Sequence, residues 1–341
     1  MRGSRLFGAM IGASLFAGSA FAEPVTVKVA TFVPEKSVGV AKVIKPWMEA
    51  VQAEAGDKIN MQAFWGGSLG KNPFKQYELV KNGVADITWV LPGYTAGQFP
   101  ELQIMELPFF AENGYEASIA GWNLYEKGML SGFDDTHLIG FFASAPNAIF
   151  TKGAITSLAD LKNKKMRSVG PIHAEWVEII GASPETIAST KMNEAFNRGI
   201  LDAAIQGWTG MNTFKTIKLV DHAHEVPIGV IPFLLLMNKN TWEKLPADVQ
   251  AIMMKHGGLA MAKAGGQAYD DIAGSLRQGV ADEGKVTFVP VTPELDKQYR
   301  ADAAPVHKSW ISKTPNGQAI YDEMQKSIAA VRGKSRHPVR V

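Results

Sequence analysis

The segment Leu158–Val169, LADLKNKKMRSV, places an arginine in the middle of a short strand that follows a capped helix. Ser157 is a suitable N-cap, Leu158 and Leu161 give the helix an inward side, and the lysines end it. The strand then carries Arg167 into a sheet, where a permanent charge is costly unless an anion neutralises it. A guanidinium can hold a carboxylate through two parallel hydrogen bonds. Arg167 is therefore either a surface residue on an edge strand or the anchor for an anion.

Residues 1–22 have the pattern of a secretory signal peptide. Arg2 and Arg5 precede the apolar stretch Leu6–Ala17, and Ala20-Phe21-Ala22 offers a small-x-small cleavage site. We therefore expect a mature chain that starts at Glu23 and is soluble outside the cytoplasm. No later segment approaches the roughly 20 uninterrupted apolar residues of a membrane-spanning helix, so we expect no membrane insertion.

Composition narrows the class of protein further. The formal charge of +2 comes from the two arginines of the signal, so the mature chain is formally neutral. A neutral chain gives no electrostatic reason to expect a nucleic-acid partner. The chain has no cysteine, which excludes disulfides and thiol chemistry, and its 46% of apolar residues must hold the fold together. About 320 mature residues are enough for two domains of roughly 100 to 200 residues each.

Strands and helices alternate along the chain, which predicts an α/β fold with largely parallel sheets. The clearest strands are expected at Ala203–Gln206 and Val230–Met237. The Ala-rich stretch Pro246–Asp282 has a helical pattern that Gly257-Gly258 and Gly265-Gly266 weaken. If continuous, this helix would be about 55 Å long at 1.5 Å per residue. That length exceeds one small domain, so we expect the helix to brace two.

A series of short motifs follows in a characteristic order from residue 64 to residue 246. The motifs are FWGGSLG (64–70), LVKNGVAD (79–86), LPFF (107–110), the 158–167 segment, GASP (181–184), NEAFNRGILD (193–202) and WEKLP (242–246). Their order and spacing resemble the solute-binding proteins of tripartite ATP-independent periplasmic (TRAP) transporters, the DctP-like family.

The resemblance implies a two-lobed periplasmic binding protein fold of the type II-like α/β class, with hinge strands and a long helix spanning both lobes. Such a protein closes on a small-molecule organic carboxylate and delivers it to the membrane permease subunits of the transporter. In that family the arginine at the position of Arg167 holds the ligand carboxylate. This agrees with the anchor that the strand itself indicates.

The implied lobes combine separate parts of the chain. Lobe I comprises residues 23–143 and 232–251, and lobe II comprises residues 144–231 and 252–330 together with the spanning helix. Residues 331–341 are expected to form a loose basic tail.

The candidate pocket departs from the sugar-acid and dicarboxylate binders of the family. Many of them have a second arginine where this chain has Asn147, which can hydrogen-bond an oxygen but cannot neutralise a second carboxylate. Phe32 and Leu91 stand at positions that are often polar, and Gln206 stands near the ligand. Trp208 either covers an apolar ligand face or packs in the core. One charge and aromatic walls predict a monocarboxylate with an apolar or aromatic body, such as an aryl 2-oxo or 2-hydroxy acid.

A serine hydrolase is the alternative reading of one motif. Residues 66–70, GGSLG, match the Gly-x-Ser-x-Gly elbow of α/β-hydrolases, with Ser68 as the nucleophile of an exported enzyme. The family loop explains the same glycines without catalysis, so we expect a binding protein and no enzyme.

No cofactor and no metal are expected. Gly70-Lys71 is followed by Asn72, whereas a phosphate-binding loop needs Ser or Thr at that position. His222 and His224 could lie on one face of a strand, but no further ligand set accompanies them. A solvated, His-rich connector is the interpretation that we favour for this segment.

Overall fold

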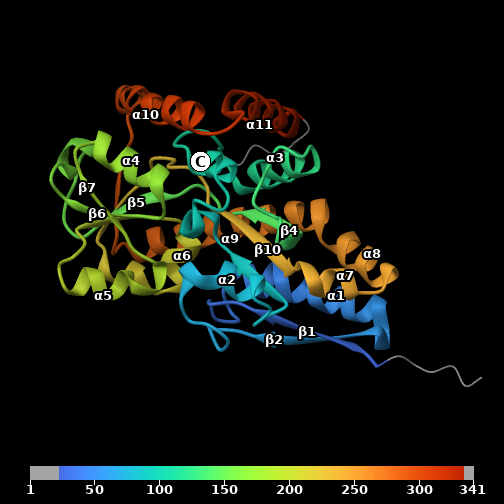
Figure 1. The fold of residues 1–341 in the computed structure, drawn as a ribbon. Coiled ribbons are helices and arrows are strands. Elements are labelled where there is room, and N and C mark those ends of the chain that lie inside the picture. The colour runs from blue at the N-terminus through green and yellow to red at the C-terminus, as the bar shows by residue number, and fades with distance from the viewer. Residues whose placement is uncertain (1–22, 334–341) are drawn as a thin grey trace, which may run out of the picture.

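Two β-sheets, each flanked by helices, form the framework of the structure, a computed structural model that describes residues 23–333 (Figure 1). The predicted signal peptide lies outside the described residues, as does the tail beyond residue 333. We call the body around the first sheet lobe I and the body around the second sheet lobe II.

The sheet of lobe I has the strand order β2-β1-β3-β10-β4. Its strands are β1 (Val25–Ala30), β2 (Ile59–Phe64), β3 (Ile87–Val90), β4 (Thr136–Ala143) and β10 (Pro232–Asn238). β1 pairs in parallel with β2 and β3, whereas β10 is antiparallel to β3 and β4. Every residue of β10 is buried, which explains its continuous apolar sequence.

The sheet of lobe II has the strand order β11-β9-β5-β8-β6-β7. Its strands are β5 (Ala148–Thr151), β6 (Lys165–Ser168), β7 (Ser183–Thr186), β8 (Ala203–Gln206), β9 (His222–His224) and β11 (Thr287–Val289). β5 is antiparallel to both of its neighbours, β8 and β9. Both sheets are therefore mixed, and the expectation of largely parallel sheets is wrong. The antiparallel members β5 and β10 adjoin the crossings between the lobes, which no local pattern reveals.

Helices cover the faces of both sheets. They are α1 (Lys45–Ala55), α2 (Gln76–Lys81), α3 (Gly114–Glu126), α4 (Pro171–Ile179), α5 (Met192–Asn197), α6 (Trp208–Thr213), α7 (Lys239–Lys244), α8 (Ala247–His256), α9 (Gly258–Glu283), α10 (Pro293–Lys313) and α11 (Gly317–Arg332). Short 3₁₀ or π-type helices are η1 (Gly39–Ile44), η2 (Gly56–Lys58), η3 (Pro73–Lys75), η4 (Pro92–Thr95), η5 (Glu101–Glu106), η6 (Leu158–Leu161), η7 (Ser189–Lys191) and η8 (Thr216–Leu219). The predicted cap at Ser157 is confirmed, since it forms a capping box with Asp160 at the start of η6.

The predicted long helix is divided in two. Gly257 separates α8 from α9, because the chain there passes so close to β4 that a Cβ on Gly257 would lie 2.3 Å from the carbonyl oxygen of Ile139. A bridge between Gly140 and Gly258 joins the same two segments. The spanning helix is therefore α9 alone, about 39 Å long for its 26 residues.

The second glycine pair does not interrupt α9 but lets it pack closely. A Cβ on Gly265 would lie 2.5 Å from Cβ of Phe142, and one on Gly266 would lie 2.6 Å from the carbonyl oxygen of Gly114. These contacts hold α9 against β4 and α3 of lobe I, and its C-terminal half packs on α6 of lobe II. The helix thus contacts both lobes, as predicted.

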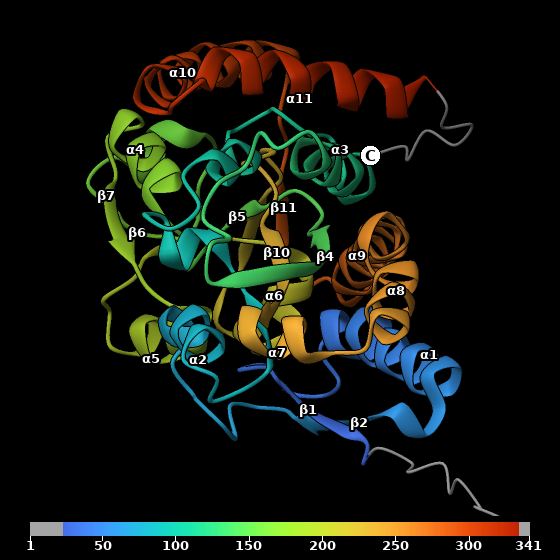
Figure 2. The same cartoon turned by 45° about the vertical axis from the view of Figure 1, so that its right-hand side comes forward.

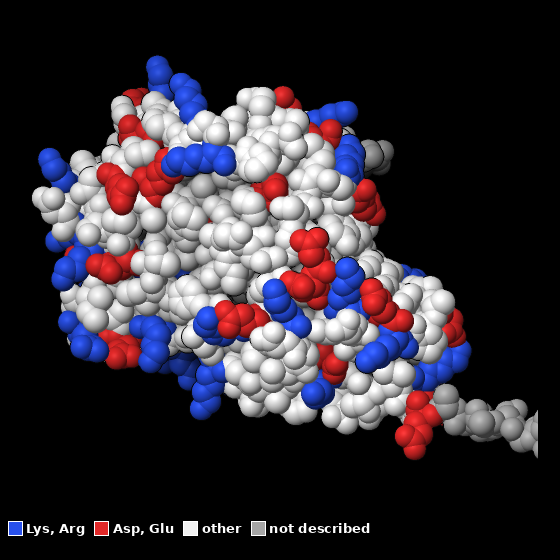
Figure 3. Space-filling view, in the orientation of Figure 1, with Lys and Arg blue, Asp and Glu red and all other residues white. Residues whose placement is uncertain are grey.

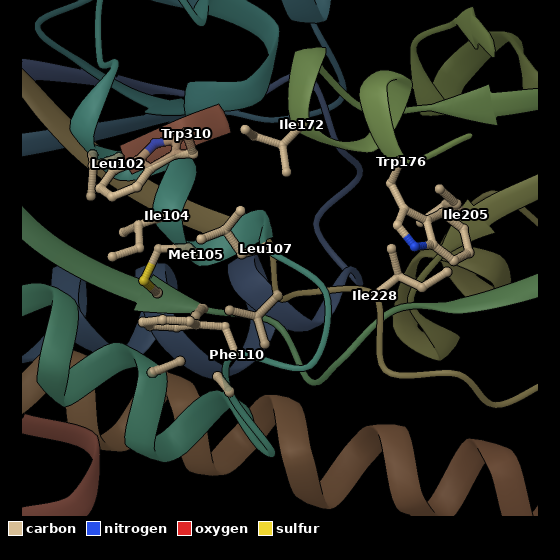
Figure 4. Close-up of a cluster of buried hydrophobic side chains, with 14 of the residues drawn as sticks. Leu102, Ile104, Met105, Leu107, Phe110, Ile172, Trp176, Ile205, Ile228 and Trp310 are labelled. Atoms are coloured by element: carbon tan, nitrogen blue, oxygen red, sulfur yellow. The ribbon is translucent and has the colours of Figure 1, made fainter. Parts of the chain in front are cut away.

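The two C-terminal helices also connect the lobes. α11 packs on α3 and α10 packs on α4, so the pair lies across the top of the molecule in Figure 2. Behind them lies a hydrophobic cluster with members from both lobes, including Leu102 and Ile104 of η5, Trp176 of α4 and Trp310 of α10 (Figure 4). This shared core also includes strand residues of both sheets, such as Phe141 of β4 and Ile205 of β8, and it joins the lobes.

The start of the expected basic tail belongs to α11. Arg332 is the last residue of this helix, and its guanidinium pairs with the carboxylate of Glu116 at 2.6 Å and with that of Glu112 at 3.0 Å. The reason is that the C-terminal end of α11 lies beside the start of α3, which offers these two acids. Arg332 is therefore not part of a loose tail.

Two crossing segments, residues 144–147 and 225–231, connect the lobes and run side by side. The N–H of Asn147 donates to the carbonyl of Gly229 at 2.9 Å, and the N–H of Ile228 donates to the carbonyl of Asn147 at 3.2 Å. Ser144 and Ile231 are joined in the same way. The strands on either side of these crossings follow the predicted division of the chain, although the lobe boundaries themselves stay a prediction.

Candidate functional site

A cavity of about 590 Å³, counted with its opening to solvent, lies between the lobes beside the crossing segments. Lobe I contributes residues that follow β1 and β3, and lobe II contributes the ends of β6 and β8 with the start of α6. The carboxyl ends of parallel strands are where open α/β sheets bind ligands.

Arg167 is the charged group of this cavity. Its side chain is only 1% exposed, and among the described residues that line the cavity it alone carries a charge. Nε donates to the carbonyl of Ile187 at 2.9 Å and Nη1 donates to that of Ile205 at 2.7 Å. Two main-chain carbonyls therefore fix the plane of the guanidinium, and β6 lies inside the sheet rather than at its edge.

Two hydroxyls meet the outer nitrogen of this guanidinium. Nη2 of Arg167 donates to the hydroxyl of Tyr94 at 3.1 Å and to that of Ser189 at 3.3 Å. Tyr94 also accepts from the N–H of Ser189, and Ser189 accepts from Nε2 of Gln206. The two hydroxyls are also hydrogen-bonded to each other at 3.0 Å, with either one as the donor, so one hydroxyl proton of the pair remains to donate. The corner is rich in donors, which suits an anion.

Glu106 is a buried acid whose charge interacts with that of Arg167. Burial raises the pKa of the Glu106 carboxyl to about 8, with the Arg167 guanidinium opposing this rise. Neither oxygen of the carboxyl has a hydrogen-bond partner among the described residues. At neutral pH this carboxyl is mostly protonated, so it leaves the charge of Arg167 largely uncompensated.

His173 shares this buried region. Burial and, secondarily, the Arg167 guanidinium lower the pKa of His173 to about 3, so the imidazole is neutral under ordinary conditions. Burial also lowers the pKa of Arg167 itself, against the effect of Tyr94 and Glu106. The environment is therefore one in which an additional anion would be stabilised.

Asn147 lines the cavity but presents a different atom from the one expected. Its Nδ2 donates to the carbonyls of Ile228 and Gly229 at 3.3 and 3.2 Å, across the two crossing segments. The amide hydrogens are therefore taken by the hinge, and they do not serve a ligand oxygen as the sequence led us to expect. Oδ1 has no hydrogen-bond partner among the described residues.

The structure brings Phe32, Leu91 and Gln206 to the same cavity as Arg167 and Asn147. Phe32 and Leu91 form part of the apolar wall of the cavity. Both functional ends of the Gln206 amide are occupied, because Nε2 donates to Ser189 at 3.1 Å and Oε1 accepts from the N–H of Gly207 at 3.1 Å.

Trp208 does not line the cavity, which corrects its predicted pocket role. Its ring stacks on Phe288 with centroids 5.7 Å apart and meets Phe150 edge-on at 4.8 Å, and its Nε1 donates to Glu225. The cause is helical phase: Trp208 begins α6, and the neighbours Gly207 and Thr209 face the cavity while the indole turns toward the core. The core alternative for this tryptophan is the one that the structure supports.

Several lining residues were missed by sequence reasoning. Tyr94 follows β3 in η4, Trp89 is in β3 itself, and Tyr269 reaches the cavity from α9. An alternation argument could have found Trp89, because it lies two residues before Leu91 and so on the same face of the strand. Nothing local indicates Tyr94 or Tyr269, since their roles depend on the packing of separate lobes.

Ser68 lies away from this site. It is exposed in the turn after β2, an edge strand, where Gly66 and Gly67 have positive φ angles of 66° and 79°. The turn leads to the short helix η3 rather than directly into the helix of a nucleophile elbow. The glycines serve the turn, and the serine hydrolase alternative has no support.

The expected His-rich connector is instead a strand, β9. His224 is fully buried, with hydrogen bonds from its ring nitrogens to the carbonyl of Val289 and the hydroxyl of Tyr299. His222 contacts Asp221 at the strand's start. The pairing of β9 between β5 and β11 buries the segment, which is why it is not solvated. Within residues 23–333, no group of three potential ligands is arranged to hold a metal.

Comparison of the chain with known proteins identifies its family. A family model described as bacterial extracellular solute-binding protein, family 7 (DctP), matches residues 29–314. The chain belongs to this family. The C4-dicarboxylate-binding periplasmic protein DctP of Rhodobacter capsulatus is 24% identical over 318 residues, 89% of this chain and 92% of that protein. The resemblance to TRAP solute-binding proteins is thereby confirmed.

Solved structures of TRAP solute-binding proteins share the fold. One from Rhodoferax ferrireducens T118, in complex with copurified benzoate, has a TM-score of 0.85 and 27% identity over 91% of this chain and 100% of its own. One from a marine metagenome, specific for aromatic acid ligands and in complex with 3-hydroxybenzoate, has a TM-score of 0.84 and 28% identity over 91% and 99%. The two-lobed α/β class predicted from the sequence is confirmed.

Proposed function

We propose that this protein captures a small aromatic or otherwise apolar monocarboxylate between its lobes and delivers it to the permease subunits of a TRAP transporter. Arg167 would hold the carboxylate, with the hydroxyl of Tyr94 or of Ser189 as a further donor. Phe32, Leu91 and Trp89 would surround the apolar body.

The observation that carries the proposal is a buried guanidinium without an ion pair. No described acid lies within salt-bridge distance of Arg167, which is only 1% exposed, whereas Arg277, whose side chain is 40% exposed, is paired with Glu225. A buried charge is stable only when it is hydrogen-bonded and neutralised. A ligand carboxylate supplies the missing charge, and the donor-rich corner supplies its hydrogen bonds.

The walls support an apolar or aromatic ligand body. Trp89 packs with Phe32, Phe142 and Phe233 at centroid distances of 6.2, 5.8 and 5.0 Å, so the wall that lobe I gives to the cavity is aromatic. A second carboxylate would meet no cation on the described walls. The aromatic acids bound by two relatives of similar fold agree with this choice of ligand class.

Location and delivery follow from the family. Its members are extracellular solute-binding proteins, and the predicted signal peptide would direct this chain to the periplasm. None of the helices within residues 23–333 is both long and apolar enough to cross a membrane. The visible face carries acidic and basic side chains interspersed, with an uncharged area at its centre (Figure 3). Transfer of ligand to separate permease subunits is the mode of action that we propose.

A thermal-shift screen followed by calorimetry tests the proposal. Benzoate, mandelate and phenylacetate should raise the melting temperature, because a ligand that binds only the native state stabilises it by mass action. Malate and succinate should bind at least tenfold more weakly. Tighter binding of a C4-dicarboxylate than of every aromatic acid tested would refute the ligand class, and binding of no carboxylate would refute the proposed function.

A further inference from the structure

Three buried side-chain atoms on the cavity wall have no hydrogen-bond partner among the described residues: Oγ of Ser37, Nε1 of Trp89 and Oδ1 of Asn147. A hydroxyl can donate or accept, and an indole N–H can only donate. Oδ1 of Asn147 can only accept. A ligand that fills the cavity must satisfy this oxygen or leave it buried and unpaired, which is unfavourable.

The orientation of the Asn147 amide is determined by the hinge. Its Nδ2 faces two main-chain carbonyl oxygens, those of Ile228 and Gly229. Exchanging the amide oxygen and nitrogen would bring Oδ1 against both carbonyls, so the reverse orientation is excluded. A Cβ placed on Gly207 would lie 3.6 Å from Oδ1, so the oxygen faces the wall formed by the start of α6.

The acceptor lies near the donor-rich corner. Nη1 of Arg167 bonds the carbonyl of Ile205 on β8, and Asn147 immediately precedes β5, which pairs with β8. Neighbouring strands are about 4.8 Å apart, so one small ligand can reach both groups. The polar walls thus form a donor site for a ligand carboxylate. Close enough for the same ligand to reach, they also form an acceptor site for an N–H or O–H group.

We infer that Asn147 selects carboxylates that also carry a hydrogen-bond donor, such as a hydroxyl, and that its Oδ1 accepts from this group. The inference rests on the proposed function and deepens it. It separates the two classes of ligand, 2-hydroxy and 2-oxo acids, between which the sequence did not distinguish. A 2-hydroxy acid offers a proton to Oδ1, whereas a 2-oxo acid brings a second acceptor against it. It also gives dicarboxylates a further disadvantage, because a second carboxylate would face an oxygen that repels it.

The test compares ligands that differ only in this group, using calorimetry on the complete mature protein. Mandelate, phenylglyoxylate and phenylacetate carry a hydroxyl, an oxo group and no oxygen beside the carboxylate, and 3-hydroxybenzoate is compared with benzoate. In at least one series the hydroxy acid should bind about tenfold or more tightly than its partners. Affinities within twofold of each other in both series would overturn the inference.

Two variants assign the preference to Asn147. Asn147→Ala should bring the affinity ratio of the hydroxy acid to its partner close to one. Leu91→Ala, which removes apolar wall, should weaken both ligands and keep their ratio. A preference that persists in Asn147→Ala would overturn the inference. Should this variant fail to fold, the comparison on the unaltered protein still decides.

Failure of the proposed function gives a different result. In that case no aromatic acid binds, or Arg167→Ala binds as tightly as the unaltered protein, and the inference falls with it. Binding that depends on Arg167 without any preference for the hydroxy acids would refute only the role of Asn147.

Discussion

The hydroxyl of Tyr94 in lobe I accepts a hydrogen bond of 3.1 Å from Nη2 of Arg167 in lobe II. The same oxygen accepts from the N–H of Ser189 at 3.0 Å, which also belongs to lobe II. One contact between the lobes is therefore made by the groups that we propose to hold the ligand carboxylate. Lobe closure and anion capture share hydrogen bonds, so each should stabilise the other.

Arg167→Ala should abolish measurable binding of aromatic acids while the protein stays folded. Truncating one partner of a desolvated ion pair costs about 2 to 5 kcal/mol or more. Arg167→Lys should also bind poorly, because an ammonium cannot reproduce the fork that bonds Ile187 and Ile205. Calorimetry checks both, with circular dichroism for folding. Arg198→Ala, at an exposed arginine paired with Glu194, is the control and should bind normally. Unchanged affinity in Arg167→Ala would contradict the assigned site.

Tyr94→Phe should lower affinity about tenfold or more, because hydrogen bonds to charged groups contribute about 1.5 to 3 kcal/mol. The substitution keeps the ring and its packing on Phe74 but removes the bonds to Arg167 and Ser189. Tyr77→Phe is a matched control, since that hydroxyl makes a long contact of 3.5 Å with Asp135 outside the cavity. Equal affinities of the two variants would argue against a role for the Tyr94 hydroxyl.

Gly170→Ala should hinder closure of the lobes. A Cβ on Gly170 would lie 2.8 Å from the carbonyl oxygen of Gly93, which belongs to the other lobe. Overpacking of this kind costs about 1 to 3 kcal/mol, so affinity should fall about tenfold. Gly274→Ala in α9, where the added methyl meets nothing within 4 Å, should leave affinity unchanged. Normal binding by Gly170→Ala would show that this contact does not limit closure.

Small-angle scattering should detect the motion itself. A protein whose lobes close around ligand has a smaller radius of gyration when ligand saturates it. The unaltered protein should show this decrease, and Gly170→Ala should show less of it at the same occupancy. A radius that stays constant, with binding confirmed by calorimetry, would count against hinge closure.

Stability should depend on pH through Glu106. Burial raises the pKa of this carboxyl from 4.5 to about 8, so the folded protein keeps a proton that the unfolded chain releases. Its contribution to stability is fully present below about pH 4.5 and is lost as the pH rises through about 8. Within that window the loss approaches about 1.4 kcal/mol per pH unit.

Glu106→Gln removes this titration and keeps the shape. The difference in melting temperature between variant and unaltered protein should therefore grow in favour of the variant between pH 5 and pH 8.5. His173, whose pKa burial lowers to about 3, destabilises both proteins alike as the pH falls below about 6.5. Parallel melting curves across the whole range would contradict the assignment of a raised pKa to Glu106.

Local patterns predicted much of the fold. β8 spans Ala203–Gln206 as expected, and the Ser157 cap precedes the strand that carries Arg167. These features depend on residues close together in the sequence: caps, apolar runs and turn glycines. The mixed sheets depend on contacts between distant segments, which no local signal announces. Two glycine pairs marked weak points of the long helix, but only the contact of Gly257 with Ile139 decides that the break falls at the first of them.

Sequence reasoning named five residues that line the cavity, but it did not indicate which of their atoms face it, and their binding of a ligand stays a prediction. Arg167, Asn147, Gln206, Phe32 and Leu91 were named from the sequence, and all of them line the cavity. Trp208 points into the core, whereas its neighbours Gly207 and Thr209 line the cavity. The amide N–H groups of Asn147 bond two main-chain carbonyls, so its oxygen rather than its nitrogen has no partner. Such outcomes depend on helix phase and on hydrogen bonds made across the hinge, which a sequence pattern does not contain.

The helices α10 and α11 offer a place to monitor the movement of the lobes without altering the cavity. α10 rests on α4 of one lobe, α11 rests on α3 of the other, and the chain turns between them at Asn316, which has a φ of 54°. α10 also reaches lobe I, where Nε1 of Trp310 donates to the carbonyl of Pro100 at 3.4 Å, so we expect a change in the angle between the lobes to shift α10 against α11. Because the chain contains no cysteine, one thiol introduced on each helix could carry a donor and an acceptor dye, and no native thiol would compete for the labels. Energy transfer between the dyes would then follow ligand capture in single molecules, from a surface that no ligand contacts.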